Sequence, residues 1–287
     1  TGMIVALFGT PSFAVPTLEA LANNPEFTLA AVVTQCDRPV GRKAVLTPPP
    51  VKVRAQELEV PVLQIEKINR EESLEQLRAL HCDVFVTAAY GQILSQKLLD
   101  IPKCGVVNVH ASLLPKYRGA SPIAWAIKNG EKFTGVTTMF SDAGIDTGDI
   151  ILQRELPIEP DDDTQTLTDK LAVAGAETLI ATLYRIMRGQ APRYRQDETL
   201  ATRTPILKKS HGQIDFTKSE HEIDCLVRAM TPWPGTWTTL DGKTLKIFGV
   251  KPALGHGDPG TVLDENFTIA CGGGALRPTE IQLEGSK

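Results

Sequence analysis

Short apolar stretches alternate with amphipathic ones over the first two-thirds of the chain. Buried strands are predicted where apolar or β-branched residues run together between turn residues, and helices where apolar residues recur with helical spacing. Strands alternating with helices predict βαβ units and an α/β domain built on a parallel sheet. The predicted strands are 3–8, 28–34, 60–63, 84–88, 106–109, 134–139 and 150–156; the predicted helices start at Ser12 and cover 51–58, 74–80 and 164–187.

The pattern changes after the long helix. Residues 189–211 lack periodicity, and between Arg185 and His211 seven Arg and Lys residues outnumber two acidic ones. Beyond a helix at 220–230, short strands separated by glycine-containing turns predict a small β-barrel. These strands are expected at 235–240, 244–250, 260–263, 267–270 and 280–283. The expected organisation is an α/β domain over 3–188, a basic linker over 189–211 and a barrel over 212–287 that is truncated at its end.

Composition narrows the class of protein without identifying it. The 287 residues are 42% hydrophobic and 22% charged, with a net charge of −4, which excludes disorder and gives no global field for nucleic acid. The five cysteines are scattered without a C-x-x-C pair, which argues against a disulfide framework or a zinc site and favours the cytoplasm. No membrane span, signal peptide or metal site is expected. Thr1 and Gly2 are interpreted as a cloning remnant.

Candidate chemistry lies at the end of the strand 106–109. Asn108 and His110 are two positions apart, so on an extended strand they point to the same side. The carboxyl ends of parallel strands are where such sheets bind ligands. An amide can donate to a developing oxyanion, and an imidazole can donate or transfer a proton near neutral pH, as acyl transfer requires. A carboxylate is needed to orient the imidazole. Asp146, in the Asp-rich turn, is the best candidate and Asp142 the second, although spacing alone does not choose between them.

Longer motifs around these residues resemble a known family. The segment Asn108-x-His110-x-Ser112-Leu113-Leu114-Pro115-x-Tyr117-Arg118-Gly119, followed by Asp146-Thr147-Gly148, is similar to the signature of the formyltetrahydrofolate-dependent formyltransferases. Further similar segments occur in order along nearly the whole chain, at 8–14, 34–42, 50–52, 89–91, 214–216 and 228–235.

The resemblance implies a Rossmann-like formyltransferase domain followed by an OB-like barrel, and a reaction. A formyl group would pass from N10 of 10-formyltetrahydrofolate, a co-substrate, to the α-amino group of methionine on initiator tRNA. By matching positions, Asn108, His110 and Asp146 form the catalytic set. The folate contacts map onto Ser112, Leu113, Leu114 and Pro115, with the pterin expected near 90–94 and 142–146.

The tRNA partner is implied by the same resemblance. The basic loop 37–43 corresponds to the family's tRNA-entering loop, with Arg42 at its key position and Arg38 and Lys43 beside it. Lys208 and Lys209 are expected to add phosphate contacts, and the protein is expected to be a monomer. The alternatives are a related formyltransferase or 10-formyltetrahydrofolate hydrolase that acts on a small molecule, or a folate- or RNA-binding protein without turnover.

Overall fold

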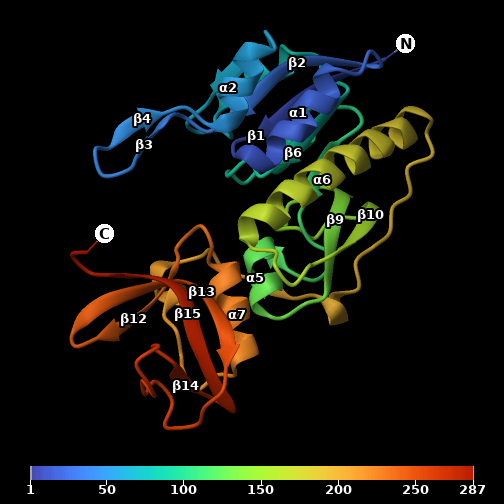
Figure 1. Ribbon diagram of the computed structural model, residues 1–287. Coiled ribbons are helices and arrows are strands. Elements are labelled where there is room, and N and C mark those ends of the chain that lie inside the picture. The colour runs from blue at the N-terminus through green and yellow to red at the C-terminus, as the bar shows by residue number, and fades with distance from the viewer. Residues whose placement is uncertain (1, 287) are drawn as a thin grey trace. The chain divides into compact units, whose positions relative to one another are not determined.

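The computed structural model describes residues 2–286, which form two units (Figure 1). The first unit contains the residues up to Arg118 together with Gly135–Leu156 and Asp169–Arg203. The second unit contains Gly119–Thr134, Pro157–Thr168 and the described residues from Thr204 onward. No helix in this part of the chain is long and apolar enough to cross a membrane.

A seven-stranded sheet forms the centre of the first unit. Its strand order is β10-β9-β7-β6-β1-β2-β5. The five strands from β7 to β5 pair in parallel, which confirms the expected Rossmann-like sheet, whereas β9 runs antiparallel to β7. The apolar pattern of a strand does not encode its direction, so this reversal was not predicted. The strands are β1 Met3–Gly9, β2 Phe27–Thr34, β5 Val62–Gln64, β6 Val84–Ala88, β7 Val106–His110, β9 Phe133–Phe140 and β10 Ile150–Pro157.

The order of the strands reverses beside β1. The chain places β2 and β5 on one side of β1, then returns to place β6 and β7 on the other side. At such a switch point, the loops that leave the carboxyl ends of neighbouring strands diverge and leave room for a ligand. The ends of β1, β6 and β7 are therefore where the fold itself favours a site.

Helices cover both faces of this sheet. Leu74 and Leu77 of α3 (Glu71–Arg78) and Leu98 and Leu99 of α4 (Gln96–Leu99) pack with Phe8, Phe85 and Val106 on one face. On the other face, Gly175 of α6 (Thr164–Met187) lies against Val109 of β7, so closely that an added Cβ would approach Val109 Cγ1 to 3.1 Å. The remaining helices of this unit are η1 Ser12–Ala14, α1 Val15–Ala22, α2 Pro50–Glu57 and η2 Glu198–Leu200.

The second unit contains a curled, four-stranded antiparallel sheet that forms half of a barrel. Its strand order is β12-β13-β15-β14, and α7 packs against it through Ile223 and Val227, which join Leu245, Ile247 and Leu276 in one core. The elements are α5 Pro122–Lys128, η3 Lys209–Gly212, α7 Glu220–Ala229, β12 Thr236–Leu240, β13 Lys243–Ala253, β14 Ile269–Cys271 and β15 Gly274–Leu283.

Two predictions for this sheet were wrong in detail. The segment 260–263 is not a strand: Val262 forms only an isolated bridge with Ile269, because Asp264 accepts hydrogen bonds from the backbone of Asn266 and Thr268 and turns the chain. The strand expected at 280–283 begins earlier, at Gly274, and continues through Pro278 as β15. The first half of β15 contains proline and charged residues, which interrupt the apolar pattern from which a strand is predicted.

An exposed arm replaces the loop expected at 37–43. Strands β3 (Arg38–Val40) and β4 (Val45–Thr47) form an antiparallel hairpin that projects from the end of β2 (Figure 1). At its base, Asp37 accepts hydrogen bonds from Gln64 Nε2 at 2.7 Å and from Lys52 Nζ at 3.1 Å, which lower the pKa of its carboxyl.

A second two-stranded sheet is formed by β8 (Arg118–Gly119) and β11 (Arg203–Thr204).

Replacing Asp83 by Ala is expected to lower the free energy of unfolding by about 1–2 kcal/mol at pH 7, the usual cost of a partly buried donor left unpaired. Its carboxylate accepts the Ile4 N–H at 2.8 Å and pairs with Lys103 at 3.0 Å; the Ile4 bond is the main reason its pKa is lowered. A lowered folded-state pKa stabilises the fold above about pH 4 and loses that effect as the pH falls through the folded-state value.

Urea denaturation at pH 7 and at about pH 3 checks this expectation. The difference between the unfolding free energies of wild type and D83A should narrow in acid. A D83A deficit that is equal at both pH values would contradict the role given to the charged carboxylate.

Candidate active site

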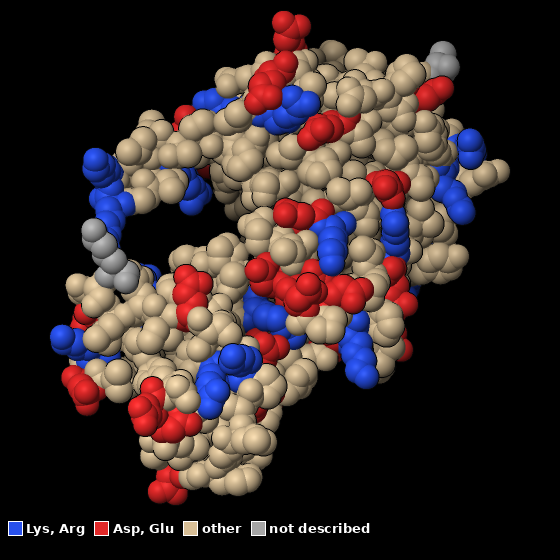
Figure 2. Space-filling view, viewed as in Figure 1, with Lys and Arg blue, Asp and Glu red and all other residues tan. Residues whose placement is uncertain are grey.

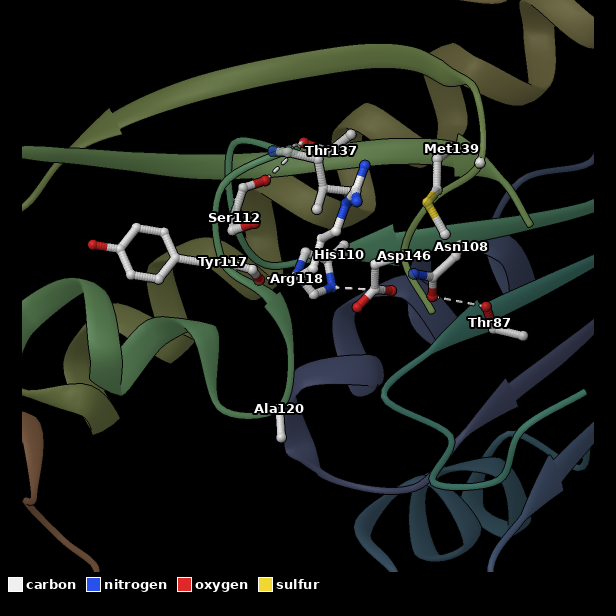
Figure 3. Close-up of polar contacts among 12 residues, drawn as sticks. Thr87, Asn108, His110, Ser112, Tyr117, Arg118, Ala120, Thr137, Met139 and Asp146 are labelled. Carbon is white, nitrogen blue, oxygen red and sulfur yellow. Dashed lines mark hydrogen bonds and ion pairs between the residues drawn. The ribbon is translucent and has the colours of Figure 1, made fainter. Parts of the chain in front are cut away.

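Asn108 and His110 lie at the carboxyl end of β7 (Val106–His110), and both side chains point toward the loop that carries Asp146 (Figure 3). His110 is buried and Asn108 is half-buried. The neighbouring strands enclose them, because Asn108 lies between Thr87 of β6 and Met139 of β9, and His110 lies opposite Thr137 of β9. The strand thus brings an amide and an imidazole to one edge of the sheet, as the two-residue spacing predicted.

The amide of Asn108 has a fixed orientation. The hydroxyl of Thr87 donates a hydrogen bond to Asn108 Oδ1 at 2.8 Å (Figure 3). With Oδ1 held on that side, the amide N–H groups are the part of the side chain that can donate to a ligand. Thr87 therefore determines which end of the Asn108 amide is available to a ligand. Sequence reasoning missed Thr87, whose only signal is a hydroxyl among the apolar residues of a buried strand.

His110 lies between two acceptors. Its Nε2 is 2.8 Å from the carbonyl oxygen of Tyr117, which can only accept, so Nε2 carries a proton. Its Nδ1 is 3.6 Å from Asp146 Oδ1 (Figure 3). A neutral ring protonated at Nε2 would turn a bare lone pair toward that carboxylate. A ring protonated at both nitrogens would turn an N–H group toward it instead.

The structure distinguishes the two carboxylates that spacing left open. Asp142 has a local role: its Oδ1 accepts the backbone N–H of Gly144 at 2.9 Å and the hydroxyl of Thr147 at 2.6 Å. Asp146 adopts a left-handed backbone conformation, with φ of 56°, and presents its carboxylate to His110. Asp146 is therefore the carboxylate that can orient the imidazole.

The segment 112–115 follows β7 and is held by its own polar contacts. Ser112 is fully buried, and its hydroxyl donates to the Lys116 carbonyl at 2.7 Å. The hydroxyl of Thr137 donates to the Ser112 carbonyl at 2.7 Å and accepts the Leu114 N–H at 3.1 Å. Leu114 is buried as well, whereas Leu113 and Pro115 are partly exposed. This segment can meet a ligand through its backbone and through the side chains of Leu113 and Pro115.

A third loop at this edge follows β6. The hydroxyl of Thr10 donates to the Tyr90 carbonyl at 2.7 Å, and Gln35 Nε2 donates to the Gly91 carbonyl at 2.9 Å. Gly91 has a φ of 103°, and an added Cβ would lie 2.7 Å from Gln35 Nε2, so the turn requires glycine. Burial raises the pKa of the Tyr90 phenol, which therefore stays protonated. The ends of β1, β2 and β6 are thus tied together at the switch point.

The predicted RNA-contacting residues lie in two places. Arg38, Arg42 and Lys43 are exposed on the arm formed by β3 and β4, where Figure 2 shows cations at its far end. Lys208 and Lys209 are exposed at the start of η3 in the second unit. Sequence reasoning missed the arm's exposed apolar side chains, which belong to Val40, Val45 and Leu46. Within residues 2–286, no group of His, Cys, Asp and Glu side chains could hold a metal ion.

The site combines a doubly wound sheet, Asn108 and His110 at the carboxyl end of β7, and Asp146 in the loop between β9 and β10. Together with the family patterns that match the chain, these features place it in the class of formyl-transferring enzymes. The pattern of the Formyl transferase family matches residues 2–183, and that of the Formyl transferase, C-terminal domain matches residues 206–287. The chain belongs to the formyl transferase family.

Relatives of known name fall within this family. The chain is 50% identical to "Methionyl-tRNA formyltransferase" of Geobacter metallireducens, over 100% of this chain and 93% of the relative. It is 47% identical to the protein of the same name from Caldanaerobacter subterraneus, over 99% of this chain and 94% of the relative.

Solved structures share the fold at low sequence identity. An N-formyltransferase from Helicobacter canadensis, described in complex with folinic acid and dTDP-3-aminofucose, superposes with a TM-score of 0.70 at 20% identity, covering 97% of this chain and 99% of that one. The sugar 3N-formyl transferase WlaRD, described in the presence of 5-N-formyl-THF, gives 0.70 at 21% identity, covering 100% and 99%.

Replacing Thr87 by Val is expected to reduce the rate of formyl transfer by about tenfold, because the amide of Asn108 is free to rotate; this is less than the loss of a whole oxyanion donor. Thr87→Ser keeps the hydroxyl and should retain most of the activity. Steady-state kinetics of both variants checks the assignment. Equal activity of T87V and wild type would show that the amide needs no such anchor.

Proposed function

We propose that this chain is an enzyme that transfers a formyl group from N10 of 10-formyltetrahydrofolate to the α-amino group of methionyl initiator tRNA, and so serves translation initiation in the cytoplasm. The observation that carries the proposal is the arrangement of Asn108, His110 and Asp146 at the carboxyl end of β7. The names of relatives about half identical over the full chain support the acceptor, and the folate compounds named with the solved relatives support the donor.

The proposed chemistry needs one oxyanion and one proton transfer. The amine nitrogen attacks the formyl carbon, and the carbonyl electron pair moves onto oxygen. The N–H groups of Asn108 and the positive charge of protonated His110 stabilise that oxygen. The bond from carbon to N10 then breaks. The proton that the amine loses is passed by the His110–Asp146 pair to N10, so that charge balances over the cycle.

The three loops at this edge are the proposed folate site. The segment 112–115 supplies backbone groups and the partly exposed side chains of Leu113 and Pro115, while Ser112 and Leu114 hold the segment in place from within. The loops 90–94 and 142–146 supply the pterin contacts. Hydrogen bonds hold all three loops: Thr137 of β9 binds the segment 112–115, Thr10 binds the loop after β6, and the loop 142–146 is closed on itself by Thr147 and Asp142. These bonds favour a site formed before the ligand binds.

The exposed arm is the proposed tRNA-reading element. An arginine can stack on an unpaired base or bind a phosphate through its planar fork. Arg42 and Lys43 lie in the turn of the hairpin, and Arg38 lies on β3 beside exposed Val40. This mixture of cations and exposed apolar side chains suits an unpaired acceptor end. Lys208 and Lys209 would add phosphate contacts, and the enzyme would act as a monomer.

Transfer of labelled formyl from 10-formyltetrahydrofolate to methionyl initiator tRNA tests the function directly. Wild type should catalyse the transfer, and His110→Ala should lose roughly 10²–10³-fold in rate while still binding the folate. Unchanged turnover in H110A would overturn the catalytic assignment. Transfer only to a small-molecule amine would overturn the tRNA acceptor and leave the formyl chemistry standing.

Arg42→Ala should raise KM for the tRNA by about tenfold or more, through loss of one stacked or phosphate-bound arginine. KM for the folate should stay the same. Arg54→Ala is the matched control, because it removes the same charge at a position outside the arm. Arg54 lies on α2 and pairs with Glu57 at 2.8 Å. Equal KM values for tRNA in R42A and R54A would contradict an RNA-reading arm.

A further inference from the structure

A buried arginine lies directly after the carbonyl that holds His110. Arg118 is 1% exposed and is among the largest fully buried side chains of the described chain. A guanidinium keeps its charge at any physiological pH, so its burial is tolerated only when its N–H groups find acceptors. Arg118 Nε and Nη2 donate to Gln196 Oε1 at 3.1 and 2.9 Å, and Nη1 and Nη2 donate to the two oxygens of Glu198 at 2.8 and 2.7 Å.

Gln196 is itself buried, with 4% of its surface exposed, and its amide has only one workable orientation. Its oxygen accepts from Arg118, and its Nε2 donates to the carbonyl oxygens of Asp146 and Gly148 at 2.9 and 2.7 Å. A flipped amide would set N–H against guanidinium and oxygen against two carbonyls. The residue therefore works as an adaptor between a cation and the loop that carries Asp146.

The loop needs such support. Asp146 adopts a positive φ, a backbone conformation that costs free energy for a residue with a side chain and that the surroundings must therefore stabilise. Gly148 passes so close to the sheet that an added Cβ would overlap the Phe140 carbonyl oxygen. The two bonds from Gln196 clamp the backbone on either side of Thr147 and so fix where the Asp146 carboxylate stands relative to His110.

Together these contacts close a circuit around the imidazole. His110 Nε2 donates to the carbonyl of Tyr117, and the next residue, Arg118, binds Gln196; Gln196 binds the Asp146 backbone, and the Asp146 carboxylate faces His110 Nδ1. We propose that Gln196, held by Arg118, which Glu198 binds in turn, is a positioning residue that sets the distance between His110 and Asp146. The proposal deepens the proposed function and rests on it for its kinetic test alone.

Glu198 is the solvent-exposed member of this hydrogen-bond network. Its side chain is 65% exposed, and its paired hydrogen bonds with Arg118 lower the pKa of the Glu198 carboxyl and raise the pKa of the Arg118 guanidinium. Both Gln196 and Glu198 come from the segment between α6 and β11, which the sequence suggested only as a basic linker. An exposed carboxylate can be changed with less risk to the fold than either buried partner.

The test replaces Gln196 by Met, which keeps the volume and removes its hydrogen bonds to Arg118, Asp146 and Gly148. Its kcat for formyl transfer should fall by about 10- to 100-fold, the range expected for a misplaced catalytic group, with both KM values within about threefold of wild type. In an Asp146→Asn background the same change should cost less than about threefold, because a residue that acts through Asp146 has little left to position.

Thr182→Val is the matched control for loss of a buried polar contact. Thr182 is fully buried in α6, and its hydroxyl contacts Thr138 at 2.7 Å, away from the loop. T182V should lose stability without changing kcat. A full Q196M loss in the D146N background, or a kcat in Q196M equal to that of wild type, would overturn the positioning role. If Q196M does not fold, Glu198→Ala replaces it, with a loss of about two- to fivefold and the same dependence on Asp146.

A readout without substrate separates this proposal from the proposed function. The ring ¹⁵N shifts of His110, measured at one pH, report which nitrogens carry protons. They should change in Q196M and stay the same in T182V. Unchanged shifts in Q196M would overturn the positioning role even if transfer activity is present. Changed shifts in a protein that transfers no formyl group would leave the positioning role standing and overturn the proposed reaction.

Discussion

The imidazole of His110 is held between two acceptors. Its Nε2 donates to the backbone carbonyl of Tyr117, and its Nδ1 faces the carboxylate of Asp146. This arrangement requires Tyr117 to turn back toward β7, Asp146 to adopt a left-handed conformation, and the strand to end at His110. The resulting site places an imidazole–carboxylate pair beside an amide whose N–H groups can donate, which are the groups that the proposed formyl transfer needs.

The sheet topology explains why the site forms where it does. The chain reverses its direction of winding beside β1. The next strands to be added, β6 and β7, carry Thr87 near the end of one and Asn108 and His110 near the end of the other. Side chains at the carboxyl ends of adjacent parallel strands meet without long loops, so Thr87 reaches Asn108 directly. The reversed strand β9 then brings Thr137 opposite His110. The mixed sheet therefore surrounds the pair with hydroxyls that fix neighbouring polar groups.

The sequence predicts the elements of this fold better than their detailed contacts. The long helix 164–187 has the predicted bounds because its periodicity extends over many turns, and Asn108 and His110 share a side because the strand period is two. Thr87 and Gln196 carry no such signal, since a polar residue in a strand or in an irregular segment shows its partner only in three dimensions. Spacing did not separate Asp146 from Asp142; the resemblance favoured Asp146, and the structure places its carboxylate beside His110. The arm's hairpin depends on pairing between two three-residue strands, which the sequence does not show.

The segment 189–203 shows how a stretch without periodicity can still be specified. It buries Gln196 against Arg118 and the loop 142–149, and Arg193 stacks on Phe140 with its guanidinium carbon 4.0 Å from the ring centre. Arg193 and Gln196 lie outside any helix or strand, so secondary-structure propensity does not predict these contacts. They depend on the free-energy cost of a buried guanidinium and of a strained turn, each of which is offset by the same glutamine. Stability and catalytic geometry are therefore joined at that residue, because the same amide satisfies the buried guanidinium and holds the loop that carries Asp146.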